Sequence, residues 1–411
     1  MCPIFKKKDK TEIENYRPIT VLNTDYKLFT KSLSNKLADV APDLIHPDQA
    51  GFMTNQSIFD QVHLLDTILP YAEITETNGI IVALDQEKAY DKIDHEYLWK
   101  VMHEMNLPER FINTVKSLYS SAETSVAING HISSFFRVTR GVRQGDPLSC
   151  LLFNLAIEPL ACMLRASPKI KGIQLPGIAN KQIVSLFADD TTVFLSEHDK
   201  YEDLTAILET WCKASTARFN INKTEIIPMG TTEYRSQVTR TRNTQTVENL
   251  DTERNSEVPE KIHIAQDGEL VRILGAWIGN KTDSTEPWSS VLDKIHADLR
   301  NWSKANLTLE DKRRVVQLCI MGRTQYLTAA QGMPESIEAM LEKAGLAFFW
   351  GKEETEGSRG PINKEILYEP IERGGRKLIN IHQRNEAIEV EELADEGVEL
   401  CVFGTRFRSE G

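Results

Sequence analysis

The chain has 411 residues, of which 41% are apolar and 26% are charged, and its formal net charge at pH 7 is −12. This length suffices for about two or three ordinary domains, whereas the sequence holds no run of roughly 18 consecutive apolar positions, no opening signal peptide and no CxxC pair, which argues against a membrane span, secretion and a zinc knuckle. The acidic charge argues against nucleic-acid binding over the whole surface, although a local groove can still be basic, as in the mildly basic residues 6–36.

The first 230 residues carry mixed strand and helix signals. The turn signal Asn78-Gly79 precedes the continuously apolar residues 80–84, which predict a buried strand that ends at Asp85. A helix is predicted over residues 95–105, which end before an Asn-Leu-Pro stop signal. The strand places Asp85 where the chain leaves the core.

Two hairpins and a long apolar helix follow. Residues 124–130 and 133–140 are predicted to be strands joined by an Asn-Gly turn. Residues 148–165 are apolar nearly all round, which is typical of a helix buried in the middle of a domain. The Asp-Pro pair at 146–147 is the predicted N-cap and first helical position, and Pro159 is expected to bend the helix.

The rest of the chain divides by composition. The β-rich residues 182–188 and 191–196 flank Asp189-Asp190 as a hairpin would. A helix is predicted over residues 201–219, because its apolar positions recur at helical spacing. Polar residues 231–262 predict a linker or surface insertion, since they lack apolar periodicity.

Order resumes after the predicted linker. Three helices are expected to begin near Pro287, Leu309 and Glu335, and residues 263–345 are interpreted as one region. Residues 346–411, with an acidic end, form a C-terminal extension whose structure the sequence predicts least.

Asp189-Asp190 is the first candidate site. Two adjacent carboxylates at a hairpin tip repel each other unless a cation neutralises them. A solvated turn is the alternative, because Asp is common in turns. The apolar flanks place this turn against a buried sheet, where unpaired charge is costly, and a hard ion such as Mg²⁺ takes oxygen ligands of this kind.

Asp85 adds a third carboxylate. A strand-terminating Asp is the alternative interpretation, and for Asp85 alone it would be preferred. Asp85 and Asp189 together can hold two metal ions about 4 Å apart, one activating a primer 3′-oxygen and one steadying a pyrophosphate. The loop GVRQGDPLS at residues 141–149 has two glycines that allow close approach to a ligand, although it also fits a well-capped buried helix.

These motifs resemble a known family. LDQEKAYDKID (84–94), GVRQGDPLS with LLFNLAIEPL (141–160) and LFADD (186–190) occur in the order and at the spacings of a reverse transcriptase. The segment NYRPITVLNTDYKLFTKSLSNKL (15–37) is similar to the fingers segment of non-LTR (LINE-type) retrotransposon enzymes. The resemblance continues through FNINKTEIIPMG (219–230) and ILGAWIGN (273–280), so it covers nearly the whole chain, and four motifs in order make chance implausible.

The resemblance implies an α+β fold of the right-hand polymerase type. Fingers and palm, with an antiparallel palm sheet plus helices, would occupy residues 1–230. The primer grip at residues 273–278 and a helical thumb would lie within residues 263–345. It also implies two Mg²⁺ ions, with Mn²⁺ as the alternative, and an RNA template, a DNA primer and dNTPs as partners. It implies no membrane association and leaves the oligomeric state open.

Site residues follow from the matching positions. Asp85, Asp189 and Asp190 match the catalytic, metal-binding aspartates. Tyr90 matches the aromatic steric gate that rejects a ribose 2′-OH, although a tyrosine packed behind the strand is an equal interpretation. Lys223 matches a lysine that protonates or neutralises pyrophosphate.

The remaining matches concern substrate. Gln144 and Gly145 match the loop that contacts the incoming nucleotide and template. Arg17 matches a fingers arginine on the triphosphate, where a planar cation suits phosphate oxygens. Lys27 is expected to assist, with a solvated surface lysine as the alternative. Cys150 stands where the family usually has proline, and we expect little effect because it opens a buried helix.

The resemblance also sets expectations for the extent of the reading frame and for the location of the protein. No endonuclease domain and no Cys/His knuckle occurs in the 411 residues, which predicts a fragment of a retrotransposon reading frame. The alternatives are a catalytically silent remnant and a group II intron or retron reverse transcriptase. A nuclear location is implied by the family's priming on chromosomal DNA. Lys6-Lys7-Lys8 is too short to act as a nuclear localisation signal.

Overall fold

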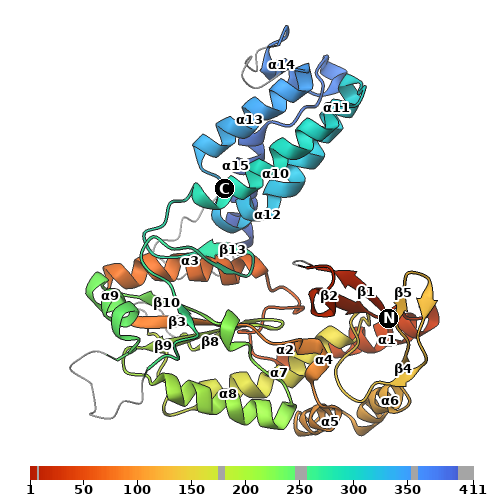
Figure 1. Ribbon diagram of the computed structural model, residues 1–411, viewed down its shortest axis with the longest axis vertical. Coiled ribbons are helices and arrows are strands. Elements are labelled where there is room, and N and C mark those ends of the chain that lie inside the picture. Colours follow the sequence, from red (N-terminus) through yellow and green to blue (C-terminus); the bar gives the residue numbers. More distant parts are fainter. Residues whose placement is uncertain (7–8, 175–180, 246–256, 353–359, 397–411) are drawn as a thin grey trace, which may run out of the picture. The chain divides into compact units, whose positions relative to one another are not determined.

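The computed structural model describes residues 1–6, 9–174, 181–245, 257–352 and 360–396. These residues form two compact units (Figure 1), which are described separately below. The first unit is Met1–Gln61 with Thr67–Gln266, and the second is Val62–Asp66 with Asp267–Gly411.

The first unit mixes strands and helices, as expected for an α+β fold. Its strands are β1 (Cys2–Phe5), β2 (Tyr16–Ile19), β3 (Gly79–Leu84), β4 (Glu123–Thr124), β5 (Ala127–Ile128), β6 (His131–Ile132), β7 (Phe136–Arg137), β8 (Val184–Phe187), β9 (Asp190–Ser196), β10 (Glu225–Met229) and β11 (His263–Ile264). Its helices are η1 (Ile13–Asn15), α1 (Thr24–Ala38), α2 (Ala41–Leu44), α3 (Ile58–Ile74, of which 62–66 belong to the second unit), α4 (Ala89–Lys92), α5 (His95–Glu104), α6 (Glu109–Ser120), α7 (Ser149–Ala166), α8 (Tyr201–Ser215), η2 (Ile221–Lys223) and α9 (Thr232–Thr241).

A five-stranded sheet in the order β11-β10-β3-β9-β8 forms the centre of this unit. The pairs β10·β3, β3·β9 and β8·β9 are antiparallel, and only the short β11 runs parallel to its neighbour β10. β3 takes the central position because its sequence GIIVAL is apolar and nearly all of it is buried. Helices α7 and α8 lie along one face of the sheet (Figure 1), so the predicted buried strand at residues 80–84 is confirmed.

Helix α7 is the buried core helix that the sequence predicts. In length and composition it alone, among the residues described, could cross a membrane, but 67% of the window concerned is buried inside the protein. The predicted start is wrong by a few residues, because the helix begins at Ser149. The Asp146 carboxylate instead accepts a hydrogen bond from the Leu148 backbone N–H (3.0 Å), and so closes a turn before the helix.

Other local predictions hold in part. The strands predicted at 124–130 and 133–140 are present only as the short pairs β4·β7 and β5·β6. The Asn-Gly turn joins β5 to β6, and positive φ at both Asn129 (+49°) and Gly130 (+82°) is the conformation such hairpin turns need. Helix α8 buries Leu204 and Trp211 on its apolar side. It ends at Ser215 rather than at 219, because Thr216 adopts a left-handed conformation.

The predicted linker at 231–262 is corrected in part. Residues 232–241 form α9, which the Thr231 side chain caps by accepting a hydrogen bond from Tyr234 N–H. Tyr234, Arg235 and Val238 are buried, and the Tyr234 hydroxyl donates to the Thr244 carbonyl (2.6 Å). This segment is therefore part of the first unit, while residues 246–256 lie outside the described part of the chain. The sequence did not predict α9, because the apolar face of this helix is too short to be recognised within a polar segment.

The second unit is mainly helical. Its elements are β12 (Val271–Ile273), β13 (Ala276–Ile278), α10 (Glu286–Trp302), α11 (Leu309–Val316), the π-helical segment η4 (Gln317–Met321), α12 (Gly322–Gln331), α13 (Glu335–Trp350), α14 (Lys364–Tyr368), η6 (Ile371–Arg373) and α15 (Ile381–Glu396). The helices predicted to begin near Pro287, Leu309 and Glu335 are present, although the second continues through η4 into α12. The unit has its own core, to which α10, α11 and α13 all contribute.

Candidate active site

Three aspartates come together at one end of the central sheet. Asp85 follows β3 directly, and the β3·β9 register pairs Leu84 with Thr191. One further step of that register sets Asp85 opposite Asp190, the first residue of β9. Asp189 precedes it in the tight turn between β8 and β9. Antiparallel pairing thus brings together carboxylates that are far apart in the sequence.

The three carboxylates influence one another's protonation. Burial raises the pKa of Asp189 and the charge of Asp85 raises it further, whereas Lys6 and Arg17 lower it. Asp190 keeps solvent access, but desolvation by the surrounding protein, together with the charges of Asp189 and Asp85, raises its pKa to about 6. Carboxylates that disfavour one another's charged form make a favourable place for a cation.

Lys223 supplies a cation directly at Asp85. Its Nζ donates to the Asp85 carboxylate at 2.9 Å. The backbone N–H of Asn220 also donates to the Asp85 carbonyl at 2.7 Å, which fixes η2 beside the end of β3. Both side chains of the ion pair are substantially exposed, at 53% for Lys223 and 37% for Asp85. A pair this exposed contributes little stability and can open at small cost.

The donor set suits a hard divalent ion, because carboxylates offer only oxygen ligands. As the side chains stand, no three His, Cys, Asp or Glu groups in the described part of the chain converge on one ion position. The Asp85 carboxylate is paired with Lys223 instead. Binding of an ion by all three aspartates therefore needs different side-chain rotamers.

Tyr90 lies on α4 and packs against α7. Its ring stacks on that of Phe153, with centroids 4.7 Å apart and an interplanar angle of 10°. Burial raises the pKa of Tyr90, as do the Cys150 thiol, which is hydrogen-bonded to its hydroxyl, and the charge of Asp189. The ring therefore lies within electrostatic reach of Asp189. The hydrogen bond between Cys150, at the family's usual proline position, and this hydroxyl was not predicted from the sequence.

The loop at 141–149 contacts two other predicted motifs, those at residues 15–37 and 84–94. Gly145 has φ of +107°, and a Cβ there would lie 2.7 Å from the Thr20 carbonyl oxygen. Gln144 accepts a hydrogen bond at its carbonyl from Thr20 N–H (2.9 Å), and its side chain hydrogen-bonds to Asp91. The loop thus lies between the segment after β2 and helix α4, with Gly145 exposed.

Arg17 and Lys27 lie on different elements. Arg17, on β2, is exposed, and its charge lowers the pKa of Asp189. Lys27, on α1, is exposed as well, and no contact among the described residues links its side chain to the aspartates. The structure therefore associates Arg17 with the carboxylates and leaves the role of Lys27 a prediction.

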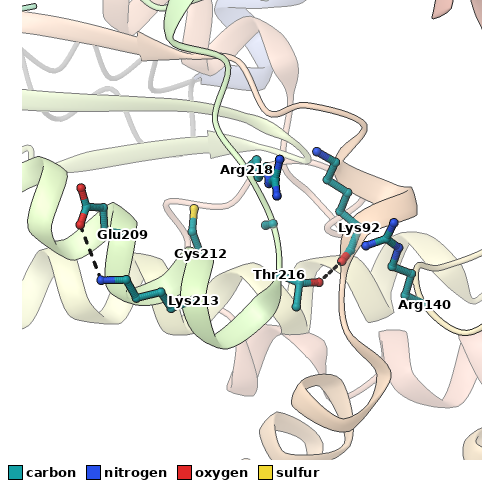
Figure 2. A pocket seen from close by; sticks show the side chains of 8 residues that line it. Lys92, Arg140, Glu209, Cys212, Lys213, Thr216 and Arg218 are labelled. Atoms are coloured by element: carbon teal, nitrogen blue, oxygen red, sulfur yellow. Dashed lines mark hydrogen bonds and ion pairs between the residues drawn. The ribbon is translucent and has the colours of Figure 1, made fainter.

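The first unit also has a basic pocket of about 600 Å³ (Figure 2). Its lining comprises the cations Lys92, Arg140, Lys213 and Arg218 with Glu209, Cys212, Thr216 and Ala217. The Arg218 carbonyl accepts a hydrogen bond from Glu87 N–H (2.8 Å), so the pocket wall runs alongside the chain just after Asp85. Two of the cations have acidic partners, Lys92 with Glu87 at 2.8 Å and Lys213 with Glu209 at 3.7 Å. The sequence did not predict this pocket, because its cations come from separate segments.

Comparison with known proteins identifies related sequences. The family described as "Reverse transcriptase (RNA-dependent DNA polymerase)" matches residues 5–254. The "Transposon TX1 uncharacterized 149 kDa protein" of Xenopus laevis is 26% identical over 411 residues, which cover 98% of this chain and 29% of that protein. A type-1 retrotransposable element R2 polyprotein of Popillia japonica is 30% identical over 198 residues, covering 48% and 27%. The "Probable RNA-directed DNA polymerase from transposon BS" of Drosophila melanogaster is 27% identical over 240 residues, covering 56% and 25%.

The chain therefore spans less than a third of the length of each of these curated relatives. Among solved structures, telomerase from Candida albicans in complex with a TWJ fragment of telomeric RNA has a TM-score of 0.41 at 10% identity, covering 81% of this chain and 55% of that one. Telomerase from Candida tropicalis with the corresponding RNA fragment has a TM-score of 0.39 at 12% identity, covering 77% and 47%.

Proposed function

The chain belongs to the reverse transcriptase (RNA-dependent DNA polymerase) family, in the non-LTR retrotransposon group, and from this premise we propose that it adds dNTPs to a primer 3′-OH on an RNA template by two-metal phosphoryl transfer. The observation that carries the proposal is the grouping of Asp85, Asp189 and Asp190 at one end of the sheet. The raised pKa values of Asp189 and Asp190 support it, because a cation would relieve the repulsion that contributes to them.

The polymerase subdomains follow from the same premise. The sheet of the first unit, with α7 and α8, is the palm. The part of the first unit from β1 to α1, with the hairpins of β4–β7, is the fingers. The helices α10 to α13 of the second unit are the thumb, and the β12–β13 hairpin holds the primer grip at residues 273–278.

The aspartates would hold two Mg²⁺ ions, with Mn²⁺ as a substitute. When bound, these ions supply the charge that activates the primer 3′-oxygen and stabilises the leaving pyrophosphate. Lys223 Nζ is bonded to only one Asp85 oxygen, which leaves the other oxygen to ligate an ion, and Nζ would donate a proton to a pyrophosphate oxygen. The ion pair between Asp85 and Lys223 therefore holds the proposed proton donor beside the proposed metal ligand.

Other residues select and orient the nucleotide. Arg17 binds the triphosphate, with Lys27 assisting, because a cation already close enough to affect Asp189 can neutralise phosphate oxygens. Tyr90 presents its ring edge where a 2′-OH would stand, held by its stack on Phe153. Gln144 and Gly145 contact the incoming base pair from the loop before α7.

Nucleic acid is the proposed partner of the basic pocket. A chain with net charge −12 needs a local cationic surface to bind RNA or DNA phosphates. The pocket that contains Arg140 and Arg218 supplies one, and its wall at Arg218 is hydrogen-bonded to Glu87, two residues after Asp85. We propose chromosomal DNA as the primer, and therefore the nucleus as the protein's location.

Primer extension tests the proposal. Purified protein with Mg²⁺, dNTPs and a DNA primer annealed to RNA should extend the primer, and Asp189→Ala should reduce extension to background. The matched control is Asp203→Ala, which removes a carboxylate on α8 that pairs with exposed Lys169 and should leave the rate unchanged. Folded wild-type protein that incorporates no dNTP with either Mg²⁺ or Mn²⁺ would instead be a catalytically silent remnant.

A further inference from the structure

Buried Gln49 sits against the turn that carries the aspartates. It is 1% exposed, and its side-chain oxygen accepts hydrogen bonds from Gly51 N–H and Ala188 N–H, both at 2.9 Å. Its side-chain nitrogen donates to the Ala188 carbonyl at 3.4 Å. A single amide thus contacts both the N–H and the C=O of the residue immediately before Asp189.

Ala188 is the residue that needs such support. Its φ is +56°, in the left-handed region that residues with a side chain seldom adopt. This conformation directs the chain from β8 through Asp189 into β9. Because the turn is left-handed without a glycine, the surrounding structure must hold it. The Gln49 amide makes two hydrogen bonds with this residue, one accepted from its N–H and one donated to its carbonyl.

The segment around Gln49 is itself tied to β8. Gln49 bridges Leu186 in parallel, with Leu186 N–H donating to the Asp48 carbonyl (2.8 Å) and Ala50 N–H donating to the Leu186 carbonyl (2.9 Å). A Cβ on Gly51 would collide with the Ala188 backbone nitrogen. Glycine is therefore required for the segment to approach the turn this closely.

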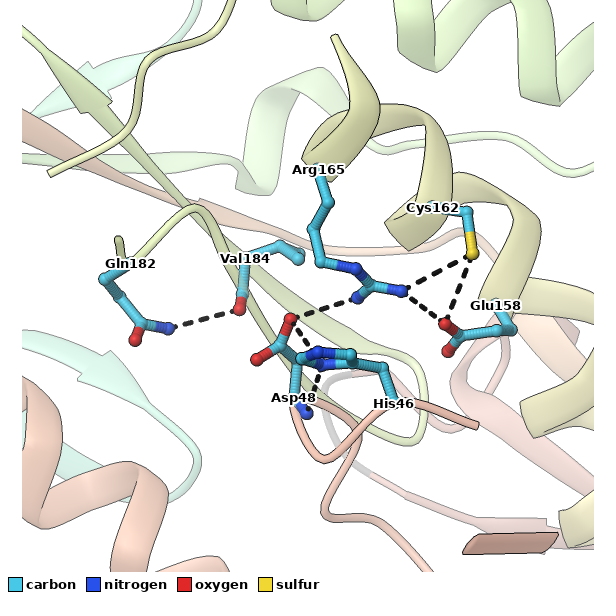
Figure 3. A network of polar contacts seen from close by, with 7 residues as sticks. All are labelled: His46, Asp48, Glu158, Cys162, Arg165, Gln182 and Val184. Carbon is cyan, nitrogen blue, oxygen red and sulfur yellow. Dashed lines mark hydrogen bonds and ion pairs between the residues drawn. The ribbon is translucent and has the colours of Figure 1, made fainter. Parts of the chain in front are cut away.

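Helix α7 anchors the same segment on both sides of Gln49. Arg165 Nη1 donates to the Asp48 carboxylate at 3.0 Å, and its other terminal nitrogen pairs with buried Glu158 (Figure 3). On the other side, the buried Asn154 amide donates to the Gly51 carbonyl at 2.6 Å. Gln49 is thus the contact by which a segment braced on the core helix reaches the turn.

We propose that Gln49 is a positioning residue: it fixes the left-handed turn at Ala188, and thereby the placement of Asp189 and Asp190 for divalent-cation binding. The inference rests on the proposed function of those aspartates. Gln49 touches neither substrate nor ion and acts through the backbone of the turn. Residues that orient ligating carboxylates typically change ion affinity or activity by roughly 10–100-fold when removed.

The test compares Gln49→Met, which keeps the side-chain length and removes all three hydrogen bonds, with a matched control. The control is Asn78→Ala, because Asn78 is an amide at the opposite end of β3 that accepts from Thr231 N–H (3.0 Å) and donates to Glu197 (3.1 Å). Two readouts are used, the Kd for Mn²⁺ from electron paramagnetic resonance of the free ion, and kcat and KM(dNTP) for primer extension. Thermal unfolding reports the stability of each variant.

Gln49→Met should weaken Mn²⁺ binding and lower kcat by roughly tenfold or more, with KM(dNTP) changed by less than about threefold. Asn78→Ala should change neither, even where it lowers Tm. Adding Ala188→Gly to Gln49→Met should restore much of the loss, because glycine adopts a left-handed φ at little cost. Should Gln49→Met fail to fold, Gln49→Asn takes its place, since its shorter side chain cannot reach Ala188 and the same direction is expected.

Unchanged Mn²⁺ affinity and kcat in a folded Gln49 variant would overturn the proposal. So would losses that track Tm equally in the Gln49 and Asn78 variants, or a double variant no better than Gln49→Met. Wild-type protein that binds no Mn²⁺ and extends no primer would instead refute the proposed function. The two failures are therefore distinguishable.

Discussion

Asp190 combines solvent access with a raised pKa, so its charged form has a free-energy cost that is present in the folded state and absent from the unfolded chain. Below the ordinary pKa of 3.8 the carboxyl is protonated in both states and makes no difference. As the pH rises from 3.8 to about 6 the unfolded chain ionises this carboxyl while the folded state resists, first through desolvation and then through the charges of Asp189 and Asp85, so stability falls. At neutral pH the ion-free site is therefore a source of instability.

Asp190→Asn should remove that cost. In EDTA, the variant should unfold at a higher temperature than wild type at pH 8, and the two should have nearly equal Tm at pH 4, because Asp190 is then protonated. Thermal unfolding followed by circular dichroism across this range is the measurement. A Tm difference that does not change between pH 4 and pH 8 would contradict the assigned pKa.

Tyr90 is argued at the same scale. Tyr90→Ala should raise the efficiency of ribonucleotide relative to deoxyribonucleotide incorporation by roughly tenfold or more, because the ring held on Phe153 is removed. Tyr90→Phe keeps the ring and should leave the preference almost unchanged. The measurement is kcat/KM for matched rNTP and dNTP pairs, and equal preferences in wild type and Tyr90→Ala would remove the gate assignment.

Among single residues, those that end a local pattern were predictable and those that act at a distance were not. Asp85 could be placed from the apolar strand before it, and Asp189 from the hairpin around it. Gln49 gave no such signal, because its partner Ala188 lies 139 residues away. The contact between Cys150 and Tyr90 likewise depends on how α4 packs on α7.

At the scale of elements, α7 does more than fill the core. It buries Glu158 and Arg165 as an ion pair, with side chains 4% and 21% exposed, and Arg165 extends to Asp48. The sequence predicted the helix from its apolar composition, yet the polar residues within it determine which loop the helix holds. Its start was misplaced because Asp146 closes a turn rather than capping the helix itself.

Arg165→Met should destabilise the protein by about 3 kcal/mol, because it leaves the buried Glu158 carboxylate without its cation. The double variant Glu158→Leu with Arg165→Met should recover most of this loss, since the buried charge is then removed and only the partly exposed Asp48 still lacks its arginine. Urea unfolding at pH 7 measures both. Equal stability of the single and double variants would show that Glu158 is not the origin of the effect.

At the scale of the whole molecule, the local distribution of charge differs from what the net charge indicates. Sixty acidic residues outnumber forty-eight basic ones, yet four cations line one pocket. Composition could not predict this, because the pocket draws Lys92, Arg140 and Arg218 from segments that only the fold brings together. The fold class could be predicted more fully from the sequence, because the motifs that indicate it are short and occur in a fixed order along the chain.

Replacing Arg140 and Arg218 together with alanine should weaken RNA binding and make the slope of log K against log salt less negative by about 1.4–1.8, the contribution of two phosphate contacts. Lys100→Ala, which removes an exposed lysine on α5, is the control and should leave the slope unchanged. Binding titrations at several salt concentrations supply the data. An unaltered slope in the double variant would place the nucleic acid elsewhere.

The contact between Gln49 and Ala188 also has a consequence for the newborn chain. A ribosome adding roughly 5–20 residues per second needs roughly 7–28 s to travel from one to the other, a separation of 139 residues. Throughout that interval the segment around Gln49 has emerged without the turn it is to hold, and β3 waits for β9. The aspartate turn is therefore completed only after residue 188 has been added, and codons or chaperones that alter the pace between these two residues should affect the yield of folded protein more than changes made before residue 49.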